Sequence, residues 1–209
     1  NNPMANLKTF SGFPIQNLTT DPVPFAQAKE NNPYQGTWAS GAALNTSRIY
    51  PAGIGTTNSS ALAVGGYGTA AIANNESYNG TSWTELNDLN SGRYGLNGRG
   101  TSTSGIVYAG ITTARVGNTE TWDGTNWTEV NDLSTVRYRA GASGTQTAAL
   151  CFGGENPGGA DIANNESWNG STWTELADLN TARNGLSGGG TQTDGLAFAG
   201  ETTVQQDFV

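Results

Sequence analysis

The most regular feature of this 209-residue chain is a short apolar run that ends in glycine and occurs four times. The runs are ALAVGG, GIVYAG, ALCFGG and GLAFAG, at 61–66, 105–110, 149–154 and 195–200. Four to six β-forming residues bounded by glycine are typical of a buried strand. No segment of useful length has the 3.6-residue period of a helix. We therefore predict an all-β protein in which each run is a strand.

Three further segments repeat together with each apolar run. A segment that begins at Arg and ends at Gly-Thr precedes it, at 48–56, 93–101, 137–145 and 183–191. A Glu-containing segment follows three of the runs, and an Asn-Gly or Asp-Gly pair (79–80, 123–124, 169–170) joins it to a Trp-Thr-Glu segment. Asn-Gly and Asp-Gly favour hairpin turns because both residues tolerate positive φ. One unit is thus predicted to hold four short antiparallel strands.

Aromatic and charged residues mark equivalent positions in the copies, which recur every 44 to 46 residues. They are Trp38, Trp83, Trp127 and Trp173; Arg48, Arg93, Arg137 and Arg183, each ten residues after a Trp; and Glu76, Glu120 and Glu166. Four short strands in a repeat of this length are typical of a β-propeller blade. We expect residues 34–209 to form four blades, with the Trp and the apolar strand filling the space between neighbours.

The apolar strand, the Gly-Gly pairs at 65–66 and 153–154, the Glu-aromatic pattern and the later Trp are together similar to the kelch repeat. The pair becomes Ala-Gly at 109–110 and 199–200, which departs from that pattern. The Thr-Gln-Thr and Asn-Gly-Thr-x-Trp-Thr-Glu motifs resemble those of degenerate kelch-type arrays in structural and tail proteins of marine bacteriophages. The resemblance implies a kelch-type propeller and a component of a virion.

The sequence contains four repeat Arg but three repeat Glu, so the number of blades in the complete ring has two interpretations. In a closed four-bladed ring, residues 183–209 would supply three strands and residues 36–44, around Trp38, the fourth. Alternatively, the chain is a fragment of a larger ring, since kelch-like rings usually have six or seven blades. Both interpretations stay open at this stage.

Residues 1–33 lie outside the repeat and carry five of the seven prolines. Prolines at this density oppose both a helix and a central strand. The segment also contains Phe and Ile, which a disordered linker would hold less often. We expect an extended anchoring arm that packs on its own domain or on a neighbouring subunit.

Composition excludes several classes of function. The net charge of −8 repels a phosphate backbone, so nucleic acid is not an expected partner. The chain has no apolar run of 18 residues, so no membrane insertion is expected. It contains no His, which excludes Ser-His-Asp and Cys-His catalysis and imidazole-bound metals. The single Cys151 lies in an apolar run and is predicted to be a buried structural thiol.

Residues that recur in every unit are expected to support the blade. We predict that the repeat Arg bond repeat Glu residues or backbone carbonyls between blades. The other repeated carboxylates are spread around the ring by its symmetry, so they predict neither a calcium site nor a glycosidase pair. No catalytic residue, metal or cofactor is expected.

The connections that follow the apolar strands differ between the copies, at 67–74, 111–118, 155–164 and 201–206. Loops of this kind lie on one face of a repeat array, which is often its binding face. Residues just after the repeat Arg, namely Tyr50, Tyr94, Tyr138 and Arg139, are expected to flank the same face. Tyr and Arg on this face can stack on sugar rings or dock a protein. The candidate ligand-binding residues are Tyr67, Tyr94, Arg115, Tyr138, Arg139, Glu155, Asn156 and Asp161.

Together with the resemblance to phage kelch-type arrays, which implies a virion component, these observations lead us to expect a non-enzymatic bacteriophage virion protein, such as a tail fibre, tip or surface module, present in several copies on the particle. Residues 1–33 would bind other virion proteins, and the propeller face would bind a host-surface glycan or protein. The alternative is a secreted, lectin-like propeller that binds carbohydrate. A propeller enzyme that uses carboxylates alone is a third interpretation.

Overall fold

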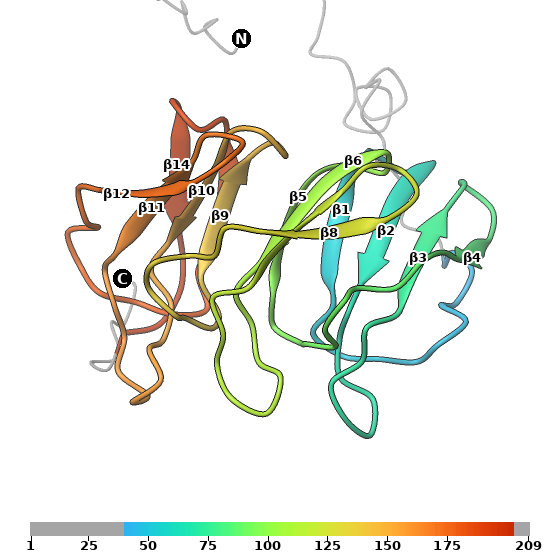
Figure 1. Ribbon diagram of the computed structural model, residues 1–209, viewed down its shortest axis with the longest axis horizontal. Helices are drawn as coiled ribbons and strands as arrows, with labels where there is room; N and C mark the ends of the chain where they lie inside the picture. The colour runs from blue at the N-terminus through green and yellow to red at the C-terminus, as the bar shows by residue number, and fades with distance from the viewer. Residues whose placement is uncertain (1–39, 203–209) are drawn as a thin grey trace, which may run out of the picture. The chain divides into compact units, whose positions relative to one another are not determined.

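In the computed structural model, residues 40–202 are described, and they form antiparallel β-sheets with no helix (Figure 1). The first sheet contains β1 (Ala52–Thr57), β2 (Ser60–Val64), β3 (Asn75–Tyr78) and β4 (Trp83–Glu85). The second contains β5 (Asn97–Thr101), β6 (Ser104–Tyr108), β7 (Thr119–Trp122) and β8 (Trp127–Val130). The third contains β9 (Gly141–Gly144), β10 (Ala149–Phe152), β11 (Asn165–Trp168) and β12 (Trp173–Leu176). The fourth contains β13 (Ser187–Gly190) and β14 (Gly195–Phe198).

The predicted all-β class is confirmed, and each strand pairs with the next strand in the chain. The hairpin turns have local causes. The side-chain oxygen of Asn79 accepts hydrogen bonds from the backbone N–H groups of Thr81 and Ser82, both at 2.9 Å, and Gly80 takes a φ of 94°. Asp123 and Asn169 make the same bonds in their own turns. The residue type before each glycine therefore fixes the turn.

The first strand of each sheet is shorter than the sequence pattern predicts. We expected it to begin at the repeat Arg, but β1, β5, β9 and β13 each begin four residues later. The reason is a left-handed residue two positions after the Arg: Tyr50, Gly95, Arg139 and Gly185 have φ values of 55°, 61°, 53° and 64°. A positive φ interrupts an extended strand.

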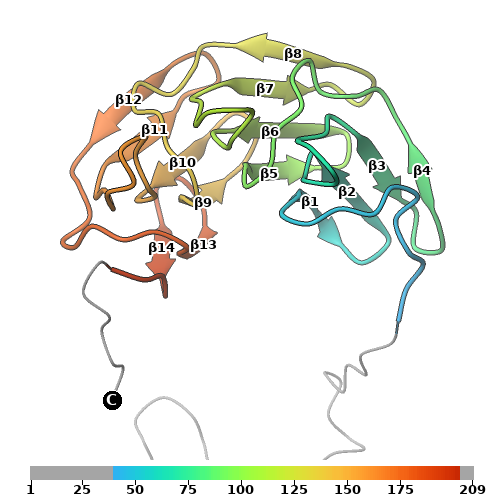
Figure 2. The same ribbon diagram turned by 90° about the horizontal axis from the view of Figure 1, so that it is seen from below.

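Within residues 41–202 the four sheets lie side by side in chain order, along an arc (Figure 2). The first strands β1, β5, β9 and β13 lie on its concave side, and β4, β8 and β12 lie on its outer side (Figure 2). This arrangement is consistent with a β-propeller-like fold. The sheets do not close into a ring within the described residues.

The segments that were predicted to close the ring are only partly included in the described residues. Of the expected closing strand at 36–44, residues 40–44 are described, and they form no strand. The carbonyl of Ala42 instead accepts a hydrogen bond from Nε1 of Trp83 in the first sheet, at 3.1 Å. Trp38, the arm at 1–33 and residues 203–209 lie outside the described residues.

The core consists of the junctions between neighbouring sheets. We call the face of each sheet that is turned to the next sheet in the chain its front face, and the opposite one its back face. The second strand of each sheet puts two large apolar side chains on the front face: Leu62 and Val64, Ile106 and Tyr108, Leu150 and Phe152, Leu196 and Phe198. The alternating positions on the back face hold smaller residues: Ala61 and Ala63, Gly105 and Val107, Ala149 and Cys151, Gly195 and Ala197.

Indole rings occupy the outer part of these junctions. Trp122 and Trp127 lie 5.2 Å apart and pack with Leu62 and Val64 of the preceding sheet. Trp168 and Trp173 lie in the next junction, where the ring of Trp173 is 4.8 Å from that of Tyr108. The third-strand indoles of Trp122 and Trp168 are almost fully buried. In the first two junctions the large front side chains thus meet small back positions and indoles, whereas in the third Leu150 and Phe152 meet Leu186 and Ala197 without an indole.

Candidate functional site

Two sets of polar residues must be separated to locate a binding face: those that hold the sheets together and those on the variable loops. The first set contains three ion pairs whose side chains are all fully buried, Arg48–Glu76, Arg93–Glu120 and Arg137–Glu166. Arg183 donates a hydrogen bond to the carbonyl of Ala199, at 3.1 Å. The three buried pairs present no charge to solvent, and the partly exposed Arg183 is bound to a backbone carbonyl of its own repeat, so we place these residues outside the binding face.

Each buried pair fixes the start of a repeat to the third strand of the same repeat, and the Glu also binds the linker from the preceding sheet. In the third sheet, Nη1 of Arg137 donates to the carbonyl of Asn164 at 2.6 Å, and Nη2 lies 2.6 Å from Oε1 of Glu166. The same carboxylate accepts the backbone N–H groups of Ser134 and Thr135, at 2.8 and 3.1 Å, from the linker that leaves the second sheet. Linker residues Asn45 and Asn90 donate to Glu76 and Glu120 in the same way.

The Arg93–Glu120 pair shows how burial opposes these charges. Burial lowers the pKa of Arg93, although the carboxylate of Glu120 opposes that shift. Burial likewise raises the pKa of Glu120, against the attraction of Arg93 and the hydrogen bonds from Asn90. The direction of both shifts indicates that desolvation is the larger effect.

The three candidate tyrosines lie in one row: Tyr67 belongs to a variable loop, whereas Tyr94 and Tyr138 each follow a repeat Arg. The rings of Tyr67 and Tyr94 lie 5.0 Å apart at an interplanar angle of 69°, and those of Tyr94 and Tyr138 lie 6.1 Å apart at 75°. Both contacts are edge-to-face, the geometry that aromatic rings prefer. The row crosses three sheets, because each Tyr belongs to a different repeat. Tyr67 is 38% exposed, whereas Tyr138 is buried.

Two guanidinium groups lie on the last tyrosine of the row. The Cζ atoms of Arg115 and Arg139 lie 6.0 and 5.3 Å from the centroid of the Tyr138 ring. Tyr138 fits here because Gly95 has no side chain; a Cβ at Gly95 would lie 2.0 Å from the ring. The contact with Tyr138 raises the pKa of Arg139, so the group stays cationic. The row therefore ends in two positive charges.

Acidic residues neutralise part of that charge. Nη2 of Arg115 forms an ion pair with Oε1 of Glu155, and Nη1 of Arg139 lies 3.6 Å from Oε1 of Glu201. Asp161 pairs with Glu155 in a β-bridge, and its Oδ1 accepts a hydrogen bond of 2.6 Å from Asn184. Oδ2 of Asp161 is buried and has no hydrogen-bond partner among the described residues.

One candidate residue supports its own loop. Oδ1 of Asn156 accepts the backbone N–H groups of Gly158 and Ala160, at 2.9 and 3.1 Å. The candidates Tyr67, Tyr94, Arg115, Tyr138, Arg139, Glu155 and Asp161 form one connected group, whereas the oxygen of Asn156 is engaged in shaping the loop at 156–160.

Two exposed residues lie at the other end of the row: Tyr50, which was expected only to flank the loop face, and Ile49, which was not predicted. Ile49 and Tyr50 are 56% and 53% exposed, and Ile49 forms a β-bridge with Tyr67. Ile49 occupies the position after the repeat Arg, which Tyr94 and Tyr138 occupy in later repeats. Comparing that position across all copies would have identified it. A recess of about 380 Å³ adjoins Ile49, Tyr67 and Thr69.

Three other features of residues 40–202 bear on the choice of site. No group of three or more His, Cys, Asp or Glu side chains in that range is placed to hold a metal ion. In the same range, no helix is long and apolar enough to cross a membrane. Cys151 is buried in the junction of the second and third sheets, and burial raises the pKa of its thiol from 9.0 to about 12. The geometry of the loops thus remains the candidate site.

Comparison with known proteins assigns no family. No protein-family model matches the chain, and no curated protein matches it.

Proposed function

We propose that this chain is a non-enzymatic binding module built as a kelch-type β-propeller, and that its loop face binds carbohydrate on a surface. The observation that carries this proposal is the tyrosine row Tyr67–Tyr94–Tyr138, with the exposed Ile49 and Tyr50 beside it. Aromatic rings with apolar faces and a hydroxyl at the edge suit the stacked and polar sides of a sugar ring. The guanidinium groups of Arg115 and Arg139 supply hydrogen-bond donors at the far end.

The site acts by rigid display. The tyrosines lie two or three residues outside the strands and are held by isolated β-bridges, such as Ile49 with Tyr67 and Tyr138 with Glu155. A rigid face loses little conformational entropy when it binds. Each contact is weak, and several copies on one particle would multiply it.

We further propose that the module belongs to a bacteriophage virion, as a tail fibre, tip or surface component, and that residues 1–33 anchor it to other virion proteins. The resemblance of the repeats to kelch-type arrays of phage structural proteins supports this assignment. Neither nucleic acid nor membrane insertion has a part in it. A secreted lectin-like propeller would use the same loop face and is the alternative.

Binding to a glycan array tests the loop face. We expect Tyr50→Ala and Tyr67→Ala each to weaken binding at least tenfold, and Leu176→Ala, which truncates an exposed apolar residue of β12, to leave it unchanged. Absence of any glycan signal from the wild-type chain would exclude carbohydrate as the ligand. Equal binding by all variants would exclude this face.

The virion assignment needs its own experiment. We expect peptides of this chain in purified phage particles from a culture that expresses the gene. Their presence only in the culture medium, free of particles, would replace the virion assignment with the secreted alternative.

A further inference from the structure

The array of sheets ends in two faces that have no neighbouring sheet in the described residues. The first is the back face of the first sheet, formed by Gly53, Gly55, Ala61 and Ala63 with Trp83; we call it the open back face. The second is the front face of the fourth sheet, formed by Leu196 and Phe198; we call it the open front face. Every other sheet face in residues 40–202 packs in a junction.

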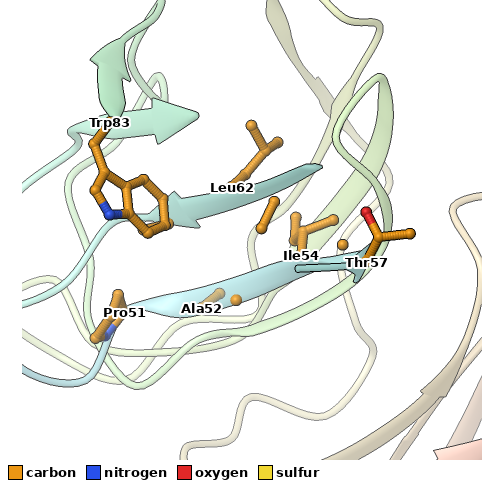
Figure 3. Close-up of a pocket in the computed structure, with 10 residues that line it drawn as sticks. Pro51, Ala52, Ile54, Thr57, Leu62 and Trp83 are labelled. Atoms are coloured by element: carbon orange, nitrogen blue, oxygen red, sulfur yellow. The ribbon is translucent and has the colours of Figure 1, made fainter. Parts of the chain in front are cut away.

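The open back face contains a recess. A space of about 330 Å³ is lined by residues of β1 and β2 and by Trp83 of β4 (Figure 3). A Cβ added at Gly53 would meet nothing within 4 Å. At the equivalent position of the second sheet, a Cβ at Gly98 would lie 2.8 Å from Cγ1 of Ile54 in the preceding sheet. The recess is thus the space that a preceding sheet fills elsewhere.

The first sheet already has the other parts of a junction. Asn45 and Thr46 donate their backbone N–H groups to the carboxylate of Glu76, at 2.7 and 3.1 Å. In the third sheet, Ser134 and Thr135 of the linker from the second sheet make the same two bonds to Glu166. The linker is therefore in place on the first sheet, and within residues 40–202 the part of a junction that this sheet lacks is the apolar front face of a preceding sheet.

The open front face has the residue types that fill the internal junctions. Leu196 and Phe198 are 64% and 48% exposed. They occupy the positions of Leu150 and Phe152 in the third sheet, which are buried. In the first junction, the front-face residues in the core are Ala52, Ile54, Leu62 and Val64, all from the first two strands of their sheet. The fourth sheet contains the equivalent two strands, β13 and β14.

We propose that the open front face of one copy of this chain packs on the open back face of a second copy, and so continues the stack of sheets between molecules. The internal junctions supply the template: large apolar side chains enter the space over Gly and Ala next to an indole. The two faces differ from each other, so the contact is heterologous, and it produces a ring or an open chain of copies according to the angle between them. This proposal does not depend on the ligand of the loop face.

Complementary variants of the full chain test the contact. Gly53→Arg blocks the back face and leaves the front face intact, whereas Leu196→Asp with Phe198→Asp blocks the front face and leaves the back face intact. We expect light scattering after gel filtration to give multiples of the 21.6 kDa mass for the wild-type chain and single copies for each variant. An equimolar mixture of the two variants should form a one-to-one complex and nothing larger, because only one pair of faces remains.

Controls separate association from folding. Circular dichroism should show that both variants are folded, with intact β-sheets and a cooperative melt of the single copy, since Gly53, Leu196 and Phe198 are exposed. Thr128→Arg, at an exposed position of β8, should associate like the wild-type chain. A wild-type mass of 21.6 kDa at every concentration, together with no complex in the mixture, would overturn the proposal. Association that survives both blocking variants would overturn it as well.

Discussion

Nη2 of Arg137 lies 2.6 Å from Oε1 of Glu166, and both side chains are fully buried between the second and third repeats. The pair joins the linker of one sheet to the third strand of the next, because Glu166 also accepts the N–H groups of Ser134 and Thr135. A buried charge that loses its partner remains desolvated and uncompensated.

The change Arg137→Met should therefore lower the free energy of unfolding by about 3–5 kcal/mol, the usual loss when one partner of a buried pair is removed. The combined change Arg137→Met with Glu166→Leu should lose less than the sum of the two single changes. Urea denaturation measures the free energy of unfolding of the two single variants and of the combined variant.

Arg115→Met is the control. It breaks a partly exposed pair with Glu155 and should lower the free energy of unfolding by about 1 kcal/mol or less. Equal losses for Arg137→Met and Arg115→Met would contradict this account.

Glycines at equivalent positions should differ in their tolerance of a methyl group. A Cβ at Gly188 would lie 2.2 Å from the carbonyl oxygen of Ala142, whereas a Cβ at Gly53 would meet nothing within 4 Å. We expect Gly188→Ala to destabilise the fold by about 1–3 kcal/mol through overpacking. Gly53→Ala should change stability by about 0.5 kcal/mol or less. Thermal denaturation compares the melting temperatures of the two variants, and equal values would show that Gly188 is not closely packed.

The thiol of Cys151 should be inert in the folded protein. It is fully buried, and its pKa is raised to about 12, so the reactive thiolate hardly forms at neutral pH. We expect a thiol-specific reagent to label the chain only after denaturation. Rapid labelling of the native protein would show that the junction opens.

The same pKa shift predicts how stability depends on pH. The folded state keeps the proton of Cys151 more tightly than the unfolded state, whose thiol ionises near 9.0. The contribution of this group is therefore fully present below about pH 9 and is lost as the pH rises towards about 12, by about 1.4 kcal/mol per unit. Cys151→Ala should show a smaller loss of stability over this range. Identical pH profiles for the two proteins would exclude the effect.

A tyrosine hydroxyl ties the second sheet to the third. The hydroxyl of Tyr108 donates to the carbonyl of Leu150 at 2.9 Å, in the buried junction. Tyr108→Phe leaves that carbonyl without this partner and should cost about 1–2 kcal/mol in urea denaturation. Tyr78→Phe removes a bond of the same length to the carbonyl of Gly80 at an exposed turn, so water replaces it and the loss should be smaller. A larger loss of unfolding free energy for Tyr78→Phe than for Tyr108→Phe would show that burial does not strengthen the Tyr108 hydrogen bond.

The local sequence was sufficient to predict the elements that depend on local interactions. Asn-Gly and Asp-Gly define the hairpins because Asn79, Asp123 and Asn169 bond backbone N–H groups two and three residues ahead. The alternation of large and small apolar residues in the glycine-bounded runs fixes which face of each sheet carries the large side chains, since successive residues of a strand point to opposite sides. The repeat itself indicated that these faces pack against copies of one another.

Other features depend on contacts between repeats, so only the tertiary structure decided them. The positive φ values at Tyr50 and Arg139, which delay the start of β1 and β9, carry no sequence signal, because neither residue is glycine. The sequence predicted that repeat Arg bond repeat Glu or backbone carbonyls, but not which Glu each one reaches; Arg48, Arg93 and Arg137 each pair with a third-strand Glu about 30 residues ahead. The row Tyr67–Tyr94–Tyr138 likewise exists because the sheets stack at a spacing that brings rings from three repeats within 5.0 and 6.1 Å. Local chemistry therefore determined the strands and turns, while the packing of sheet on sheet determined which side chains from separate repeats meet.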